Sequence, residues 1–190
     1  MDCQVNRYSL KSSTGMLALL FVAGAFTAAF AQEAWLYGSE IPCATAPVYG
    51  IPFNNCAVSN RRTFRIGSVQ SWRLTFADSK SEFAIGLYRL VEAQGGAGMS
   101  PVPTNSGMID WIRAAEALRS VASGGTGWAL NGNYVTFQKS QRQCLAFVRN
   151  GPAPDGQQKW ILGAAFCREA VAPIPASEAQ FIVDAIKVRE

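Results

Sequence analysis

The sequence predicts an α+β fold: a single domain with an antiparallel sheet, two or three helices and an N-terminal arm held by a disulfide. Two observations carry this prediction. Short segments with alternating apolar and polar residues, or with continuous apolar runs bounded by turn residues, are typical of strands. Amphipathic stretches of helical spacing are interspersed with them, without the regular strand–helix alternation that a parallel sheet requires.

Residues 1–31 have the composition of a secretory signal peptide. Arg7 and Lys11 form a basic start, and an apolar run over residues 16–31 follows it. The run ends in Ala29-Phe30-Ala31, with small residues at the two positions that signal peptidase reads. An uncleaved anchor is the alternative, but the run is shorter than the roughly 20 residues that cross a bilayer. We therefore expect a periplasmic or secreted protein that meets the membrane only through its signal peptide.

Residues 32–62 are rich in Pro, Gly and Asn, which predicts an irregular N-terminal arm before an α+β domain over residues 63–190. Four cysteines remain after cleavage, an even number in a chain bound for an oxidising compartment. Three pairings are possible, and we favour Cys43–Cys56 with Cys144–Cys167 because each pair lies within one local segment. The chain has no C-x-x-C motif and no histidine to complete a zinc set, so we expect no metal and no cofactor.

The middle of the chain contains one predicted strand and one predicted helix. Residues 72–76 alternate apolar and polar side chains, which indicates a half-buried strand. Ser79 and Glu82 have the spacing of a capping box, so we predict a helix over residues 80–93. Gly86 and the alternation of apolar residues at positions 83, 85 and 87 leave a strand open as the alternative.

Residues 94–107 hold four glycines and two prolines, which predicts an exposed loop or flap. A helix is predicted over residues 108–121, ended by Ser123-Gly124-Gly125. Strands are expected at residues 134–137, 144–148 and 160–167, the last two as an antiparallel pair across a Pro/Gly-rich loop.

A C-terminal helix is predicted over residues 178–188. Ser177 and Gln180 have the spacing of a capping box, and Lys187 and Arg189 would lie near the negative end of the helix. The larger aromatic residues lie on predicted apolar faces, which favours a place in the core; they are Trp72, Tyr88, Trp111, Trp128 and Trp160.

The absence of histidine restricts the chemistry most. It excludes Ser-His-Asp and Cys-His catalysis, and neither S-x-x-K nor G-x-S-x-G is present. A carboxylate pair acting on cell-wall glycan is the enzyme that the composition still allows. The acidic residues available for it lie in the predicted helical half, where helix caps and surface charges are the simpler interpretation: Glu82, Glu92, Asp110 and Glu116.

The charge of the exported chain is small. Removal of Arg7, Lys11 and Asp2 from the 17 basic and 13 acidic residues leaves 15 against 12, which does not indicate nucleic-acid binding. One concentration of positive charge is suited to an anionic glycan, a lipid head group or an acidic partner; it comprises Arg61, Arg62, Arg65 and Arg73.

Two segments, TFADSKSEFAIGLYRLVEA and CLAF…ILGAAFCREA with the amphipathic tail after it, resemble small exported proteins of unassigned function in rhizobia-like bacteria. The resemblance covers about residues 72–188 and implies a Gram-negative periplasm, without implying a role for any residue. We therefore expect a non-catalytic periplasmic protein that binds a protein partner or an envelope component. The alternatives are the carboxylate enzyme and an inhibitor of an extracytoplasmic enzyme.

Overall fold

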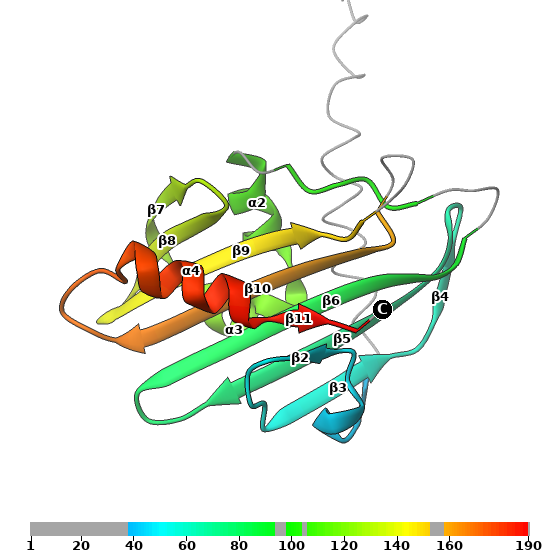
Figure 1. The fold of residues 1–190 in the computed structure, drawn as a ribbon, viewed down its shortest axis with the longest axis horizontal. Helices are drawn as coiled ribbons and strands as arrows, with labels where there is room; N and C mark the ends of the chain where they lie inside the picture. The colour runs from blue at the N-terminus through cyan, green and yellow to red at the C-terminus, as the bar shows by residue number, and fades with distance from the viewer. Residues whose placement is uncertain (1–37, 94–97, 104–105, 153–157, 190) are drawn as a thin grey trace, which may run out of the picture.

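A computed structural model describes residues 38–93, 98–103, 106–152 and 158–189, so the predicted signal peptide lies outside the described residues. The main feature is a nine-stranded antiparallel sheet in the order β1-β3-β5-β6-β10-β9-β8-β7, with β4 also paired to β5 (Figure 1). Its strands are β1 (Gly38–Glu40), β3 (Asn55–Ser59), β4 (Arg62–Phe64), β5 (Gly67–Ala77), β6 (Ser81–Ala93), β7 (Thr126–Asn131), β8 (Tyr134–Lys139), β9 (Arg142–Asn150) and β10 (Trp160–Glu169).

Each face of this sheet carries its own layer. The helix face is covered by α2 (Ser106–Ala114), the 3-10 turn η2 (Glu116–Leu118) and α3 (Arg119–Ala122). The arm face is covered by η1 (Cys43–Thr45), by a two-stranded sheet of β2 (Val48–Tyr49) with β11 (Lys187–Val188), and by α4 (Ala176–Ala185). In Figure 1 the arm-face elements lie in front of the sheet and the helix-face elements behind it.

The α+β prediction is confirmed in outline, because an antiparallel sheet, three α-helices and two disulfides are all present among the described residues. The sheet takes a larger share than a balanced α+β fold would give it. The strands predicted in the second half are confirmed as β8, β9 and β10, and the strand predicted at residues 72–76 lies within β5. In the part of the chain that the structure describes, no helix is long and apolar enough to span a membrane.

The helix predicted over residues 80–93 is wrong, because this segment is β6. Its alternate side chains enter two different cores: Phe83, Ile85 and Leu87 on the arm face, Ala84 and Tyr88 on the helix face. Such alternation needs a strand and is incompatible with a helix that buries one stripe. The apparent capping box is part of a turn, in which the Asp78 carboxylate accepts hydrogen bonds from the backbone N–H groups of Lys80 and Ser81 at 2.7 and 2.6 Å.

The other helix predictions need smaller corrections. The segment 108–121 is divided into α2, η2 and α3, and it ends at Ala122, directly before the predicted stop. The C-terminal helix begins at Ala176 and ends at Ala185, so it is shorter than predicted. Ser177 does not cap it, since Pro175 occupies the N-cap position. Lys187 belongs to β11, because the last residues pair with the arm instead of extending the helix.

Two segments predicted to be irregular contain more structure than expected. Within the arm, β1 and β3 join the main sheet, and the predicted bridge Cys43–Cys56 is confirmed. In the predicted loop, Met99 pairs with Gln158, and the buried Val102 exchanges backbone hydrogen bonds with the Asn150 side chain. Residues 94–97 and 104–105 of that loop lie outside the described residues.

A pair of glycines lets the helices approach the sheet closely. Gly86 of β6 lies directly opposite Gly163 of β10. A Cβ atom on Gly163 would lie 2.4 Å from Cζ3 of Trp111, and one on Gly86 would lie 2.7 Å from Cβ of Ala117. Both distances are shorter than a van der Waals contact, so only glycine allows α2 and η2 this approach.

Candidate functional site

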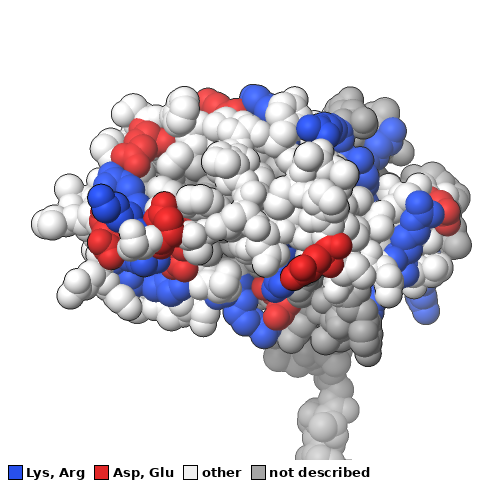
Figure 2. All heavy atoms as spheres, turned by 90° about the horizontal axis from the view of Figure 1, so that it is seen from below, with Lys and Arg blue, Asp and Glu red and all other residues white. Residues whose placement is uncertain are grey.

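The four arginines singled out in the sequence do not form one site. Arg61, Arg62 and Arg65 lie in and beside β4, whereas Arg73 is in the middle of β5. Arg62 is opposite Val69 on β5, and Arg73 lies four residues farther along that strand, about 13 Å away at the usual rise per residue. Arg61 forms an exposed ion pair with Glu92 at 3.1 Å. On the side shown in Figure 2, basic and acidic side chains are mixed over the left part of the surface, and several basic ones lie near one another at the upper right.

The candidate carboxylates are also dispersed. Glu82 and Glu92 lie near opposite ends of β6, ten residues apart, which corresponds to about 33 Å of extended strand. A glycosidase requires its two carboxyl groups within roughly 10 Å of each other. Glu116 forms an ion pair with Arg119, and Asp110 is exposed on α2. This arrangement indicates that these carboxylates stabilise helices and strands, and it does not favour a catalytic pair.

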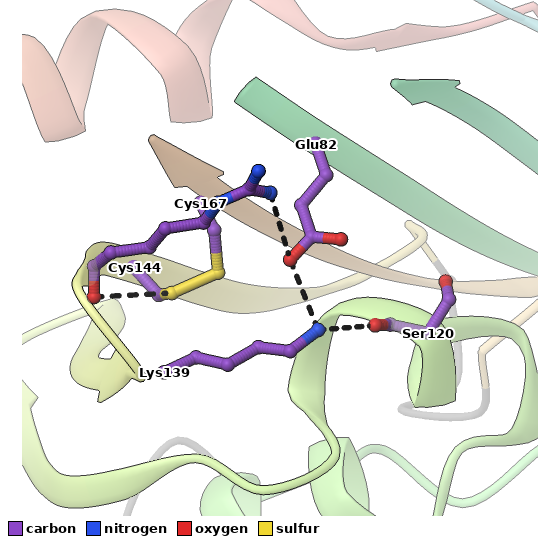
Figure 3. Close-up of a disulfide and its surroundings, with 6 residues drawn as sticks. Glu82, Ser120, Lys139, Cys144 and Cys167 are labelled. Atoms are coloured by element: carbon purple, nitrogen blue, oxygen red, sulfur yellow. Dashed lines mark hydrogen bonds and ion pairs between the residues drawn. A yellow bond between two sulfur atoms is a disulfide. The ribbon is translucent and has the colours of Figure 1, made fainter. Parts of the chain in front are cut away.

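Glu82 belongs to a charged cluster beside the second disulfide on the helix face (Figure 3). It is opposite Cys167 on β10, which in turn is opposite Cys144 on β9, and the two cysteines form the predicted bridge. Lys139 Nζ lies 3.0 Å from Glu82 Oε1 and donates a 2.6 Å hydrogen bond to the carbonyl oxygen of Ser120. The cluster therefore ties α3 to the sheet, which is a structural role.

A pocket of about 410 Å³ lies on the arm face, at the end of the sheet where β9 and β10 meet the two-stranded sheet. Five short segments supply its wall: β2, the end of β9, the turn after it, the start of β10, and β11. The lining residues are Tyr49, Arg149, Asn150, Pro152, Trp160, Lys187 and Val188. We call this the arm-face pocket.

Two aromatic rings form part of the wall. The ring of Trp160 lies against the backbone of Gly151, where an added Cβ would come within 2.6 Å of the indole. The N–H of Gly151 also donates a 2.7 Å hydrogen bond to the Trp160 carbonyl oxygen. The indole is therefore held beside the first residue of the β9–β10 connection. Tyr49 is 45% exposed, and the guanidinium of Arg189 lies 5.5 Å from the centre of its ring. Both rings are thus fixed by their surroundings and remain accessible.

Two cations accompany the rings. Arg149 Nη2 donates a hydrogen bond to the carbonyl oxygen of Ile186, while its buried Nε has no hydrogen-bond partner among the described residues. Burial lowers the pKa of the Arg149 guanidinium, and nearby Asp184 partly opposes this effect. Lys187 is exposed on β11. None of the described lining residues is acidic, so an anionic group would compensate the partly buried positive charge.

Sequence reasoning missed this pocket. Trp160 packs partly buried against the arm-face core, close to the prediction, but its place in a pocket was not expected. Lys187 was expected in a helix, and neither Tyr49 nor Arg149 stood out. Two sequence features give a weak indication of a site at these positions. Tyr49 lies between Pro47 and Gly50 in the arm, and Gly151-Pro152 ends the strand after Arg149. Nothing local indicates that these segments meet.

Within the described residues, no three His, Cys, Asp or Glu side chains are grouped as metal ligands would be. No protein-family model, curated protein or solved structure matches the chain.

Proposed function

We propose that this chain is an exported, non-catalytic protein that binds an anionic component of the cell envelope in the arm-face pocket. The observation that carries the proposal is the joint presence of Arg149, Lys187, Tyr49 and Trp160 in one cavity without an acidic lining residue. The volume of about 410 Å³ lies within the range of small-ligand sites. Two disulfides agree with an oxidising compartment outside the cytoplasm.

The lining favours a ligand that combines an acidic group with a ring that presents an apolar face. Guanidinium and ammonium groups bind carboxylates and phosphates, and their interaction strengthens when the cation is partly removed from water, as at Arg149. The accessible rings of Tyr49 and Trp160 offer apolar contact area for the body of the same ligand. Acidic saccharides of the envelope have both features.

The direct test is calorimetric titration with an oligosaccharide of alternating glucuronate and N-acetylglucosamine, compared with its carboxyl-reduced counterpart. We expect the acidic oligosaccharide to bind and the neutral one to bind about tenfold more weakly, because the pocket cations lose their partner. Added salt should weaken the acidic complex more than any neutral one.

A matched pair of variants locates the site. Lys187→Ala removes an exposed cation of the pocket and should weaken the acidic complex about fivefold, whereas Lys80→Ala removes an exposed cation from the distant β5–β6 turn and should change nothing. Equal affinity for the neutral oligosaccharide, no binding of the acidic one, or equal effects of the two variants would contradict the proposal.

A further inference from the structure

We infer that the Cys43–Cys56 bridge positions the arm-face pocket, so that its reduction by a dithiol weakens ligand binding while the nine-stranded sheet stays folded. This inference rests on the proposed function, because it concerns control of the same pocket. It assigns different roles to the two disulfides: one supports a binding site and the other supports the fold.

The Cys43–Cys56 bridge closes the segment that forms one wall of the arm-face pocket. Tyr49 lies between Cys43 and Cys56, which are 13 residues apart in the chain. Within this segment β2 pairs with β11, and the pairing places Tyr49 opposite Lys187 and Val48 opposite Val188. Three of the lining residues, Tyr49, Lys187 and Val188, therefore belong to the two-stranded sheet.

The two-stranded sheet of β2 and β11 is held in place by hydrogen bonds, by buried side chains and by the bridge. Arg189 joins its two sides, since the N–H donates to the Pro47 carbonyl oxygen at 2.7 Å and Nη1 donates to that of Ala44 at 3.2 Å. Two arginines of the main sheet also contact it: Arg149 Nη2 donates to the Ile186 carbonyl oxygen, and Arg89 Nη2 donates to that of Arg189. Its inner contacts are the buried Ala46 and Val48 against the arm-face core. The bridge adds a covalent tie to Cys56, which lies opposite Leu74 in the main sheet. The β1–β3 pairing also anchors this segment, but only through hydrogen bonds, so loss of the covalent tie lowers the cost of local opening of residues 43–56.

The two disulfides differ in their accessibility to solvent. Cys43 is partly exposed at the surface of the arm, whereas its partner Cys56 is only 3% exposed, so the first bridge is accessible from the Cys43 side. Cys144 and Cys167 are only 2% and 0% exposed, beside the cluster of Glu82 and Lys139. Thiol–disulfide exchange requires a thiolate to reach a sulfur atom, so a dithiol attacks the bridge at Cys43 first.

The exchange is balanced in atoms and electrons. One thiolate of the dithiol attacks Sγ of Cys43, the Sγ–Sγ bond breaks, and Cys56 leaves as a thiolate that takes up a proton. The second thiol of the reductant then attacks the mixed disulfide and releases Cys43 as a thiol. Two electrons pass to the bridge, and the reductant departs as its own disulfide.

The test follows both bridges in the exported chain during graded treatment with dithiothreitol. Differential alkylation and mass spectrometry should show modification of Cys43 and Cys56 at least about tenfold faster than that of Cys144 and Cys167. Over the same interval, affinity for the glucuronate oligosaccharide should fall about fivefold, amide exchange of β2 and β11 should accelerate, and the circular dichroism of the sheet should stay constant. A Cys43→Ser/Cys56→Ser variant should show the weakened affinity without reductant.

The outcomes separate this inference from the proposed function. Equal modification rates for the two bridges, or unchanged amide exchange in β2 and β11, would overturn the inference whether or not any ligand binds. Full affinity in the Cys43→Ser/Cys56→Ser variant would overturn it as well. Faster exchange in β2 and β11 with no oligosaccharide binding even before reduction would support the positioning role and count against the proposed ligand class.

Discussion

The helix face and the arm face cover the same sheet in different ways. On the helix face, the covering elements are consecutive in the chain and approach the sheet closely over Gly86 and Gly163. The arm face is covered by two separate pieces, one from the arm and one from the C-terminal segment, which are joined by the β2–β11 pairing and by contacts of Arg189 with Ala44 and Pro47. The helix face encloses the Cys144–Cys167 disulfide, whereas the arm face leaves the arm-face pocket open. Under the proposed function, the binding site and the buried Cys144–Cys167 bridge therefore lie on opposite sides of one sheet.

The largest effect should follow from removing the bridge of the helix face. Cys144→Ala/Cys167→Ala should lower the free energy of unfolding by about 3 kcal/mol, because the unfolded chain gains freedom. Urea unfolding measures this change. Pocket affinity, measured well below the melting temperature, should be retained. If this variant instead lost affinity while Cys43→Ser/Cys56→Ser kept it, the comparison between the faces would be reversed.

Gly163→Ala should destabilise by about 2 kcal/mol, since its methyl group would overlap the ring of Trp111. Chemical denaturation of the single variants and of Gly163→Ala/Trp111→Leu forms a double-mutant cycle. The smaller side chain at position 111 should reduce the cost of the added methyl group. Additive effects would show that the close approach at this glycine is not what limits substitution.

Alkaline pH should destabilise the protein through the helix face. Burial, followed by the nearby charge of Glu116, raises the pKa of Tyr88 above its ordinary value of 10.0. The unfolded chain therefore loses this proton at lower pH than the folded chain, so stability is full below pH 10 and falls above it by about 1 kcal/mol per pH unit. Unfolding measured from pH 9 to pH 11 checks this, and Tyr88→Phe should remove the contribution.

The smallest effect concerns the turn that joins β5 to β6. Hydrogen bonds from the backbone of Lys80 and then Ser81 lower the pKa of Asp78 below its ordinary value of 3.8. Its stabilising contribution is therefore present above that value and is lost as the pH falls through the lower, folded-state pKa. Carboxyl NMR titration should find this depressed pKa, and Asp78→Ala should loosen the turn without affecting the pocket. An ordinary pKa would show that these hydrogen bonds are not maintained in solution.

Local patterns predicted the parts of this fold whose partners lie nearby in the chain. The antiparallel strands β9 and β10, and both disulfide pairings, could be inferred from spacing within short segments. The error at β6 arose because Ser79 and Glu82 imitate a capping box, although Gly86 and the alternation after Phe83 favoured a strand. In such a short segment, burial on both faces of a sheet decides the structure, and no local pattern reveals that burial.

The arm-face pocket was beyond sequence reasoning for a related reason. Tyr49, Lys187 and the β9–β10 hairpin, which carries Arg149 and Trp160, are three distant parts of the chain. The pairing that unites Tyr49 with Lys187 consists of two residues on each strand. Strands of this length have no measurable periodicity. The arginines around position 61 were conspicuous because they are close in sequence, whereas the pocket cations become neighbours only in the folded chain.

The pairing of β2 with β11 also sets the order in which the molecule can be completed. Tyr49 and Lys187 are 138 residues apart in the sequence, so their pairing closes a long loop. β5 and β6, in contrast, pair across a short turn. We therefore expect the arm-face pocket to form late in folding, after the strand pairs that are local in sequence.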